Sequence, residues 1–252
     1  LKHRRGLAST YERAKQWNEA IEEWRRVMER VDEPRRRASA RGRIIDIYRK
    51  QHRLRSQIDV YRREFDGTNE TRDAGYFLAE SHLRLGRFDR ALDVYTTIVE
   101  MDGEWGEGDV EALLALERIY RQRGEWKKAI TQLERLAELR PKHRRDYFHR
   151  MAELSLKLYR DEQAVEYAMK AVEANPQSPE AYARLAEVYR KMGRVDEAVE
   201  TYREAWRLNQ EAHGHAMKLA KLLEGRGDWK EAVQLYRRVA REAADRARIL
   251  EA

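Results

Sequence analysis

The sequence predicts an all-α protein, a stack of tandem antiparallel helix pairs, and two observations carry that prediction. A short motif recurs seven times: an apolar residue, two polar residues, a small residue, and then apolar or small residues four and seven positions further on. A second apolar set at helical spacing precedes each copy. The motif centres lie 34 to 38 residues apart, at Ala20, Gln57, Ala91, Ala129, Ala164, Ala198 and Ala232. A period near 34 residues indicates identical supersecondary units stacked on one another.

The first helix of each unit is predicted by apolar residues at i, i+3, i+4 and i+7, which share one helical face. The sixth unit illustrates this spacing with Tyr182, Leu185, Ala186 and Tyr189. Its leucine position is apolar in every unit, where the residues are Leu7, Ile44, Leu78, Leu116, Met151, Leu185 and Leu219. A glycine ends this helix in four units, as expected for a left-handed C-terminal residue: Gly86, Gly124, Gly193 and Gly227.

The second helix of each unit carries the recurring motif, and the sixth unit again shows the pattern. Its residues Val195, Ala198, Tyr202 and Ala205 form one apolar stripe, and the alanine leaves room for a neighbouring backbone. We therefore expect a single solenoid over residues 1–252. Its repeats are predicted at about 1–34, 38–71, 72–105, 110–143, 145–178, 179–212 and 213–246, with a C-terminal helix extension to 252.

On these motifs the chain resembles the tetratricopeptide repeat (TPR) family over nearly all of its 252 residues. The copies starting near Arg145, Pro179 and His213 are clearest in register, and Pro141 and Pro176 near repeat ends match the family habit. The second repeat differs most from the family pattern, because Ile45, Gln57 and Glu64 replace small or apolar residues. In the fourth repeat Glu117 occupies a position that is usually small. The resemblance implies a right-handed α-solenoid, a superhelix that works as a non-enzymatic protein-interaction scaffold or assembly adaptor.

Composition limits the class of protein further. No window approaches the roughly 20 apolar residues that a membrane-spanning helix needs. The chain has no cysteine, so disulfides and thiolate metal sites are excluded. The lack of cysteine favours a reducing cytoplasm and leaves a periplasmic location open. We expect no cofactor.

Positive charge is concentrated near the beginning of the chain. Residues 1–71 hold 19 Lys and Arg against 12 Asp and Glu, which accounts for the whole formal excess of +7. Its densest part, the basic patch, contains Arg35, Arg36, Arg37, Arg41, Arg43, Arg49, Lys50, Arg53 and Arg55. A solvated helix face, an acidic protein partner and a polyanion such as nucleic acid or an anionic surface are all open interpretations. Nucleic acid is the least favoured, since Tyr48, the aromatic residue inside the patch, occupies a core position.

A binding groove is expected on the first helices, because in TPR proteins the residues one step beyond the packing stripe resemble a concave ligand-facing surface. In this chain that row places apolar residues in three consecutive repeats, with arginines nearby. Such a row suits an apolar anchor flanked by carboxylates, on a peptide or helix of a partner. The alternative is that a loop or terminal helix covers these side chains. The predicted groove residues are Tyr76, Leu83, Leu114, Arg118, Arg121, His149, Leu156 and Arg190.

Catalytic and metal-binding motifs are not recognisable. His213 and His215 are the only close histidine pair, and they have no evident further ligands. The acidic, glycine-rich segment 102–109 lacks the calcium-loop glycine and terminal glutamate, so we expect its Trp105 to pack back on the repeats or to contact a partner. The chain is therefore predicted to be neither an enzyme nor a metal-binding protein.

The C-terminal helix carries an apolar edge, at Ala243, Ala244, Ala247 and Leu250. A solenoid needs either polar caps or further stacking. We expect this edge to meet another repeat, a partner or a second copy of the chain.

Overall fold

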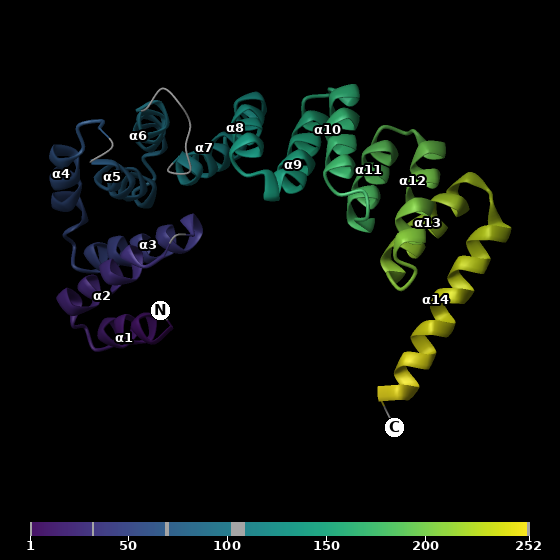
Figure 1. Cartoon of the computed structure of the whole chain (residues 1–252), viewed down its shortest axis with the longest axis horizontal. Helices are drawn as coiled ribbons and strands as arrows, with labels where there is room; N and C mark the ends of the chain where they lie inside the picture. The colour runs from purple at the N-terminus through teal and green to yellow at the C-terminus, as the bar shows by residue number, and fades with distance from the viewer. Residues whose placement is uncertain (1, 32, 69–70, 102–108, 251–252) are drawn as a thin grey trace. The chain divides into compact units, whose positions relative to one another are not determined.

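The computed structural model describes residues 2–31, 33–68, 71–101 and 109–250, and for residues 243–250 it describes the backbone alone. Within this part of the chain it contains fourteen α-helices, which follow one another as seven pairs (Figure 1). Contacts between Cα atoms divide the chain into two compact units, Leu1–Leu139 and Arg140–Ala252. We describe each unit by itself, and the single solenoid over residues 1–252 stays a prediction.

The first unit contains four helix pairs. Their bounds are α1 (Lys2–Arg13) with α2 (Trp17–Glu29), α3 (Pro34–Lys50) with α4 (Leu54–Glu64), α5 (Arg72–Arg84) with α6 (Phe88–Glu100), and α7 (Val110–Gln122) with α8 (Trp126–Leu139). Helix α3 begins at Pro34, before the predicted start of its repeat at residue 38. Proline suits the first turn of a helix, where its missing N–H has no intrahelical acceptor. This early start places Arg35, Arg36 and Arg37 inside the helix.

The second unit contains a short 3-10 turn (Pro141–His143) and three helix pairs. These are α9 (Arg144–Lys157) with α10 (Asp161–Ala174), α11 (Pro179–Lys191) with α12 (Val195–Leu208), and α13 (His213–Arg226) with α14 (Trp229–Leu250). Helix α11 has Pro179 at its first position and Ser178 as its N-cap, whose Oγ accepts a hydrogen bond from the Ala181 N–H at 3.3 Å. Helix α14 is the longest helix of the described chain, with 22 residues.

The core of both units is built from the recurring motif. The motif alanines Ala20, Ala91, Ala129, Ala164 and Ala198 are fully buried, and Ala232 is 2% exposed. The apolar position of the first helix is buried in every repeat except the first, where Leu7 is 42% exposed. Small residues at the motif centres let neighbouring helices approach closely, while the large apolar residues fill the space between them.

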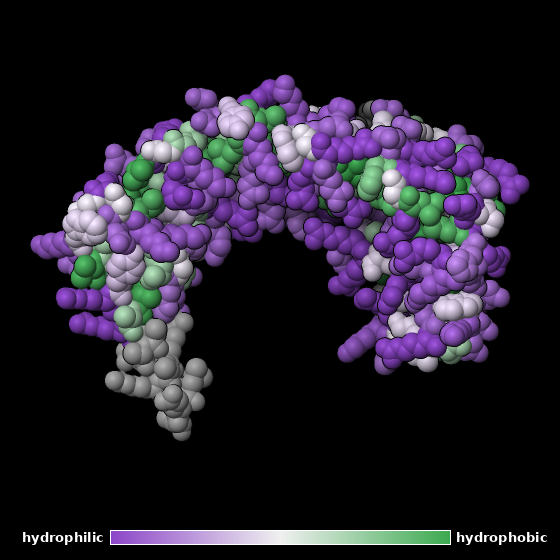
Figure 2. Space-filling view, turned by 180° about the vertical axis from the view of Figure 1, so that it is seen from behind, coloured by the Kyte–Doolittle hydropathy of each residue, from purple (hydrophilic) through white to green (hydrophobic). Residues whose placement is uncertain are grey.

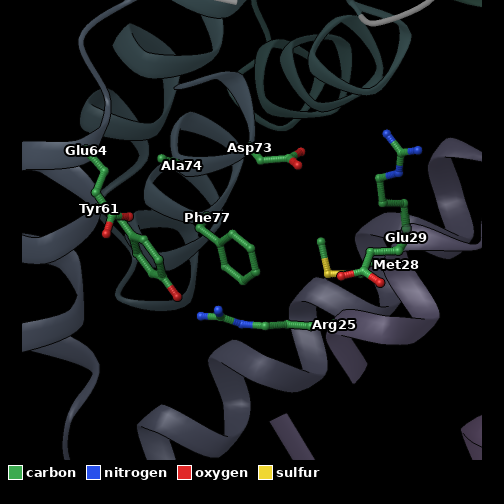
Figure 3. A pocket seen from close by; sticks show the side chains of 9 residues that line it. Arg25, Met28, Glu29, Tyr61, Glu64, Asp73, Ala74 and Phe77 are labelled. Atoms are coloured by element: carbon green, nitrogen blue, oxygen red, sulfur yellow. The ribbon is translucent and has the colours of Figure 1, made fainter. Parts of the chain in front are cut away.

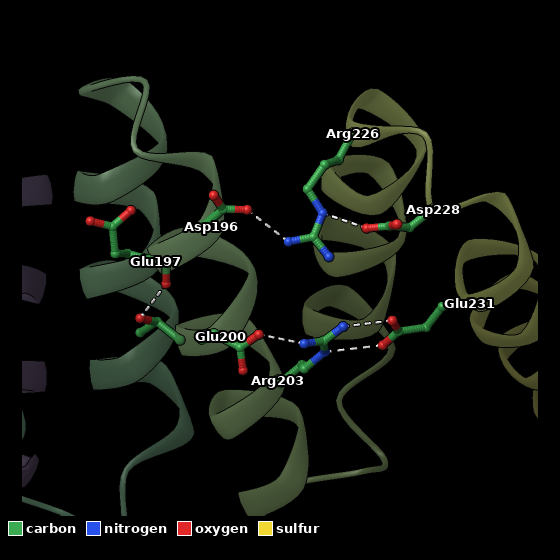
Figure 4. Close-up of polar contacts among 8 residues, drawn as sticks. Asp196, Glu197, Glu200, Arg203, Arg226, Asp228 and Glu231 are labelled. Atoms are coloured by element: carbon green, nitrogen blue, oxygen red, sulfur yellow. Dashed lines mark hydrogen bonds and ion pairs between the residues drawn. The ribbon is translucent and has the colours of Figure 1, made fainter.

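Ion pairs link successive repeats at their exposed turns (Figure 4). In the second unit Arg226, at the end of α13, pairs with Asp196 of the preceding repeat at 2.9 Å. In the first unit Arg123 and Asp89 occupy the same two repeat positions and pair at 2.6 Å. Arg203 of α12 adds a two-pronged contact to Glu231 of α14, with distances of 3.1 and 2.6 Å. These pairs join successive repeats at the surface, where each contributes little to stability.

The turns within the repeats have one conformation but different residues. Gly86, Gly124, Gly193 and Gly227 have positive φ, as the sequence predicts. The other three turns reach the left-handed region with Lys15, His52 and Tyr159, at φ between 55° and 58°. A side chain at such a φ costs free energy that glycine avoids. The repeat geometry therefore imposes this conformation even where the sequence does not favour it.

Candidate functional site

The predicted groove residues belong to both units, so they form two separate sets. Tyr76, Leu83, Leu114, Arg118 and Arg121 lie in the first unit, on α5 and α7. The others, His149, Leu156 and Arg190, lie in the second unit, on α9 and α11.

Tyr76 does not line an open groove, because it is only 4% exposed. The guanidinium of Arg41, on α3, lies 4.6 Å from the centre of its ring, and the Tyr95 ring of α6 lies 6.3 Å away. An arginine at this distance from an aromatic face is attracted by its negative potential. Side chains from α3 and α6 thus cover Tyr76, which differs from the exposed groove position that the sequence predicts.

Arg41 is itself completely buried, so it does not contribute to an exposed basic patch. Its guanidinium makes a close two-pronged contact to Glu111 of α7, and Glu80 of α5 lies 3.8 Å away. Burial raises the pKa of the Glu80 carboxyl, and Glu111 raises it further, while Arg41 opposes the shift. This arginine therefore connects the second, third and fourth repeats through charge.

The remaining groove residues of the first unit are accessible. Leu83 and Leu114 are half-buried, and Arg118 and Arg121 are exposed. Arg121 pairs with the buried Glu117 on the same helix at 3.4 Å. Arg118 forms no ion pair at contact distance among the described residues, although the Glu80 carboxylate of α5 is near enough to attract it. Half-buried leucines beside such an arginine can hold an apolar group that carries a neighbouring negative charge.

The second unit has a small hollow where its groove residues lie. His149, Glu153, Leu156, Glu187 and Lys191 are among the residues that line it. Leu156 is half-buried, but His149 is only 4% exposed and its Nδ1 has no hydrogen-bond partner in the described structure. Burial, together with Arg184 and Arg145 nearby, lowers the pKa of His149 to about 4. The histidine is therefore neutral at pH 7.

Arg190, the last predicted groove residue, is exposed but already engaged. Its guanidinium donates two hydrogen bonds to Glu187, at 2.8 and 2.5 Å. The same carboxylate accepts a hydrogen bond from the Tyr202 hydroxyl at 3.3 Å. A ligand carboxylate would have to compete with Glu187 for this arginine.

The basic patch is partly neutralised by acidic neighbours. Arg36 pairs with Glu33 at 2.7 Å, Arg49 with Asp46 at 3.6 Å, and both Arg43 and Lys50 lie within 3.8 Å of Glu12. Four arginines of the patch have no ion-pair partner among the described residues: Arg35, Arg37, Arg53 and Arg55. Uncompensated positive charge therefore remains at the start of α3 and at the start of α4, and the rest of α3 is compensated.

A hollow of about 360 Å³ lies between α2, α3, α4 and α5 of the first unit (Figure 3). The rings of Tyr61 and Phe77 stack there with centres 4.9 Å apart, and Met28 adds apolar surface. The Tyr61 side chain is 3% exposed, and its hydroxyl lies beside the Gln57 side chain. The repeat pattern assigns these residues to the core, so the sequence gives no signal for this hollow. It is large enough for one apolar side chain.

Two predictions fall on parts of the chain that are not described. Trp105 lies in segment 102–108, outside the described residues. The backbone of α14 continues to Leu250 as the sequence predicts, but the side chains of Ala243, Ala244, Ala247 and Leu250 are not described.

The histidines and carboxylates of the described residues include no cluster of three or more that could hold a metal ion. His213 instead contacts a Glu242 carboxylate oxygen through its Nε2, at 2.8 Å. Among the described helices none is long and apolar enough to cross a membrane.

Matches to models of known protein families support the helix pairs and their period. Models of the tetratricopeptide repeat match residues 76–144, 162–222 and 217–249. No curated protein matches the chain. The chain belongs to the tetratricopeptide repeat family.

Solved structures with the same fold are distant in sequence. The MamA protein is 22% identical, with a TM-score of 0.55 over 72% of this chain and 96% of that one. MamA from Desulfovibrio magneticus RS-1 is 19% identical, with a TM-score of 0.51 over 72% and 98%. The C-terminal part of a TPR repeat-containing protein from Cytophaga hutchinsonii is 14% identical, with a TM-score of 0.62 over 92% and 93%. These similarities confirm the predicted fold class, a right-handed α-solenoid.

The family assignment gives the chain its general role. Tetratricopeptide repeats serve as protein-interaction scaffolds and are generally not enzymes. The chain is a protein-interaction scaffold by class.

Proposed function

We propose that the chain is a non-enzymatic assembly adaptor that holds a peptide or helix of a partner protein on the first helices of its repeats. One observation supports the first unit as the place: Arg118 forms no ion pair at contact distance among the described residues, and the half-buried Leu114 lies one helical turn before it. Leu83, on the preceding first helix, is also half-buried. We expect the partner to insert an apolar side chain beside these leucines and to place a carboxylate against Arg118.

A phage-displayed library of random peptides tests this proposal. Selected peptides should share a large apolar residue with Asp or Glu nearby. Their affinity, measured by fluorescence anisotropy, should fall about tenfold on Leu114→Ala and on Arg118→Glu, since each change removes one interaction of roughly 1.4 kcal/mol.

Arg90→Glu is the matched control for Arg118→Glu, because Arg90 is also exposed without an ion pair in the described structure but lies on α6, outside both the groove and the basic patch. It should leave peptide affinity unchanged. Equal affinities of the Arg118→Glu variant and the unaltered chain would rule out this place. Tyr76→Ala is not a useful probe, because removing a buried ring changes stability as well as binding.

The basic first two repeats offer a second candidate function, binding of a polyanion. The unpaired Arg35, Arg37, Arg53 and Arg55 favour it, although the ion pairs of Arg36, Arg43, Arg49 and Lys50 reduce the available charge. Binding to single-stranded DNA should then weaken steeply with salt, and neutralising Arg35, Arg36 and Arg37 should flatten that dependence. Salt-independent binding, or none, would exclude this function.

A further inference from the structure

Helix α14 carries two apolar rows: the inner row is buried, and the outer row is exposed except at Tyr236. The inner row includes Ala232 and Leu235, which are 2% and 6% exposed and belong to the core of the second unit. The outer row, formed by Trp229, Val233, Tyr236 and Ala240, lies on a neighbouring face of the same helix. Trp229 is 61% exposed and Val233 is 43% exposed. Figure 2 shows hydrophobic atoms reaching the surface around α14, beside mostly hydrophilic side chains.

The exposure of Trp229 separates it from the other tryptophans at its repeat position. Trp17 and Trp126 also begin the second helix of their repeats, and both are half-buried. The motif assigns all three to packing, so the sequence alone does not distinguish Trp229. A large aromatic side chain on a rigid helix can provide much of the binding free energy of an interface.

The spacing of the outer row fits a helical partner. Its four residues follow one another at intervals of four, three and four, which is the spacing of the apolar seam in a coiled coil. A seam of this kind accepts the apolar face of a second helix lying along it. Trp229 and Val233 are its large exposed apolar side chains. Tyr236 is half-buried against the core of the second unit, and its hydroxyl donates a hydrogen bond to Glu224 at 3.0 Å.

Basic side chains beside the outer row favour an acidic partner over a second copy of the chain. Lys230, Arg237 and Arg241 are exposed on the side of this row that faces away from the core, and none has an ion-pair partner among the described residues. The described acids of α14 are on another face and are already engaged: Glu231 with Arg203, and Glu242 with His213 and Arg238. A second copy of the chain would bring basic side chains against basic side chains, which opposes self-association.

We propose that the outer row of α14 is a docking surface for an amphipathic helix of a partner protein whose apolar row is flanked by Asp or Glu. The surface is distinct from the groove on the first helices. The apolar seam supplies the contact area. The unpaired Lys230, Arg237 and Arg241 select an acidic partner and orient it.

Two synthetic helical peptides test the proposal with the full chain. Both have leucine at the apolar heptad positions, and one has glutamate and the other lysine at the flanking positions. Like charges keep each peptide from pairing with itself. In fluorescence anisotropy the glutamate peptide should bind and the lysine peptide should not.

Variants assign the binding to this surface. Trp229→Ala should weaken the glutamate peptide about 30-fold, the loss expected of an aromatic anchor at a hot spot. Phe88→Ala is the matched control, since Phe88 is 43% exposed at the same repeat position of the third repeat, and it should change nothing. The double variant Lys230→Glu with Arg237→Glu should reverse the preference to the lysine peptide. Circular dichroism confirms folding, because all four positions are exposed.

Several outcomes would overturn the proposal. Equal binding of both peptides would show that the basic side chains do not select the partner. Binding of neither peptide would show that the outer row does not dock a helix. A dimer in analytical ultracentrifugation that Trp229→Ala dissociates would assign the surface to a second copy. Trp229-dependent binding to phosphatidylglycerol vesicles without binding to the glutamate peptide would assign it to a lipid surface.

Discussion

Arg41 is a fully buried charge whose neighbours come from three repeats. Its guanidinium is satisfied mainly by Glu111 and by the ring of Tyr76. Arg41→Ala should lower the free energy of unfolding by about 3 kcal/mol, because it leaves Glu111 without its countercharge in a partly buried site. Arg41→Met should cost less, since it refills the space.

Urea denaturation followed by circular dichroism measures both Arg41 variants. The control is Arg43→Ala, whose side chain is 50% exposed with a 3.8 Å contact to Glu12, and which should cost under about 1 kcal/mol. Equal losses for Arg41→Ala and Arg43→Ala would mean that burial of the charge has no consequence for stability.

Tyr159 is strained and exposed at the same time. It is 93% exposed, with φ 55°, at the turn where four other repeats have glycine. Tyr159→Gly should stabilise the second unit by about 1 kcal/mol, since glycine adopts this conformation without steric cost. Gly193→Ala is the converse change, at φ 74° with open space around the added Cβ, and it should destabilise by a similar amount. Thermal unfolding of the two variants should shift in opposite directions.

His149 should make the second unit sensitive to acid. Its pKa is lowered to about 4, below the ordinary value of 6.5, so the unfolded chain binds a proton first as pH falls. The stability from the neutral ring is complete above pH 6.5 and is lost between pH 6.5 and 4. As pH is lowered from 6.5 to 4, the unaltered chain should lose about 2 kcal/mol of unfolding free energy relative to the His149→Leu variant.

Urea titrations at several pH values measure the effect of His149, with His143→Leu at an exposed histidine of the same unit as the control. A pH-independent difference between the His149→Leu variant and the unaltered chain would contradict the assignment of a buried neutral ring.

At the scale of the helix pair, alanine packing should matter more than the surface ion pairs. Ala198 is fully buried at the centre of its motif, so Ala198→Leu should cost about 2 kcal/mol through overpacking. Arg226→Ala removes the 2.9 Å pair with Asp196, whose side chain is 83% exposed, and should cost under about 1 kcal/mol. Urea denaturation of the two variants compares their losses of unfolding free energy. A larger loss for Arg226→Ala than for Ala198→Leu would contradict the prediction that alanine packing matters more.

The helices could be predicted from sequence because each carries its own periodic pattern. Apolar residues at helical spacing mark most of the helices locally, and the glycines mark four of the turns. The left-handed turns at Lys15, His52 and Tyr159 give no local signal, since the requirement comes from the repeat geometry. The repeat period places the start of the second repeat at residue 38, whereas α3 begins at Pro34.

The candidate site was less predictable, because its contacts join residues far apart in sequence. Arg41 belongs to a run of basic residues, and its partner Glu111 follows 70 positions later. Only the folded register shows that this arginine is buried and covers Tyr76. The positions of Leu83, Leu114 and Arg118 on the first helices follow from the repeat pattern, but whether they bind a partner stays a prediction.

On the scale of the whole molecule, the two compact units should respond separately to local changes. A stack of repeats is stabilised by each repeat and by its contacts with neighbours, so an effect declines with distance along the stack. Arg41→Ala should increase amide hydrogen exchange in α3, α5 and α7 and leave α11 to α13 unchanged. Mass spectrometry of the exchanged peptides measures this, and a uniform increase over both units would indicate a single cooperative body.

The contact between Arg41 of α3 and Glu111 of α7 also has a mechanical consequence. A stack with contacts between adjacent repeats alone peels apart one repeat at a time under tension. Here the ion pair between Arg41 and Glu111 joins the second repeat directly to the fourth, and the third repeat lies between them in the sequence. The α5–α6 pair therefore cannot be drawn out until that ion pair separates. In an optical trap pulling on the first unit, the length of these three repeats should be released in one step, and Arg41→Met should divide that step into smaller ones.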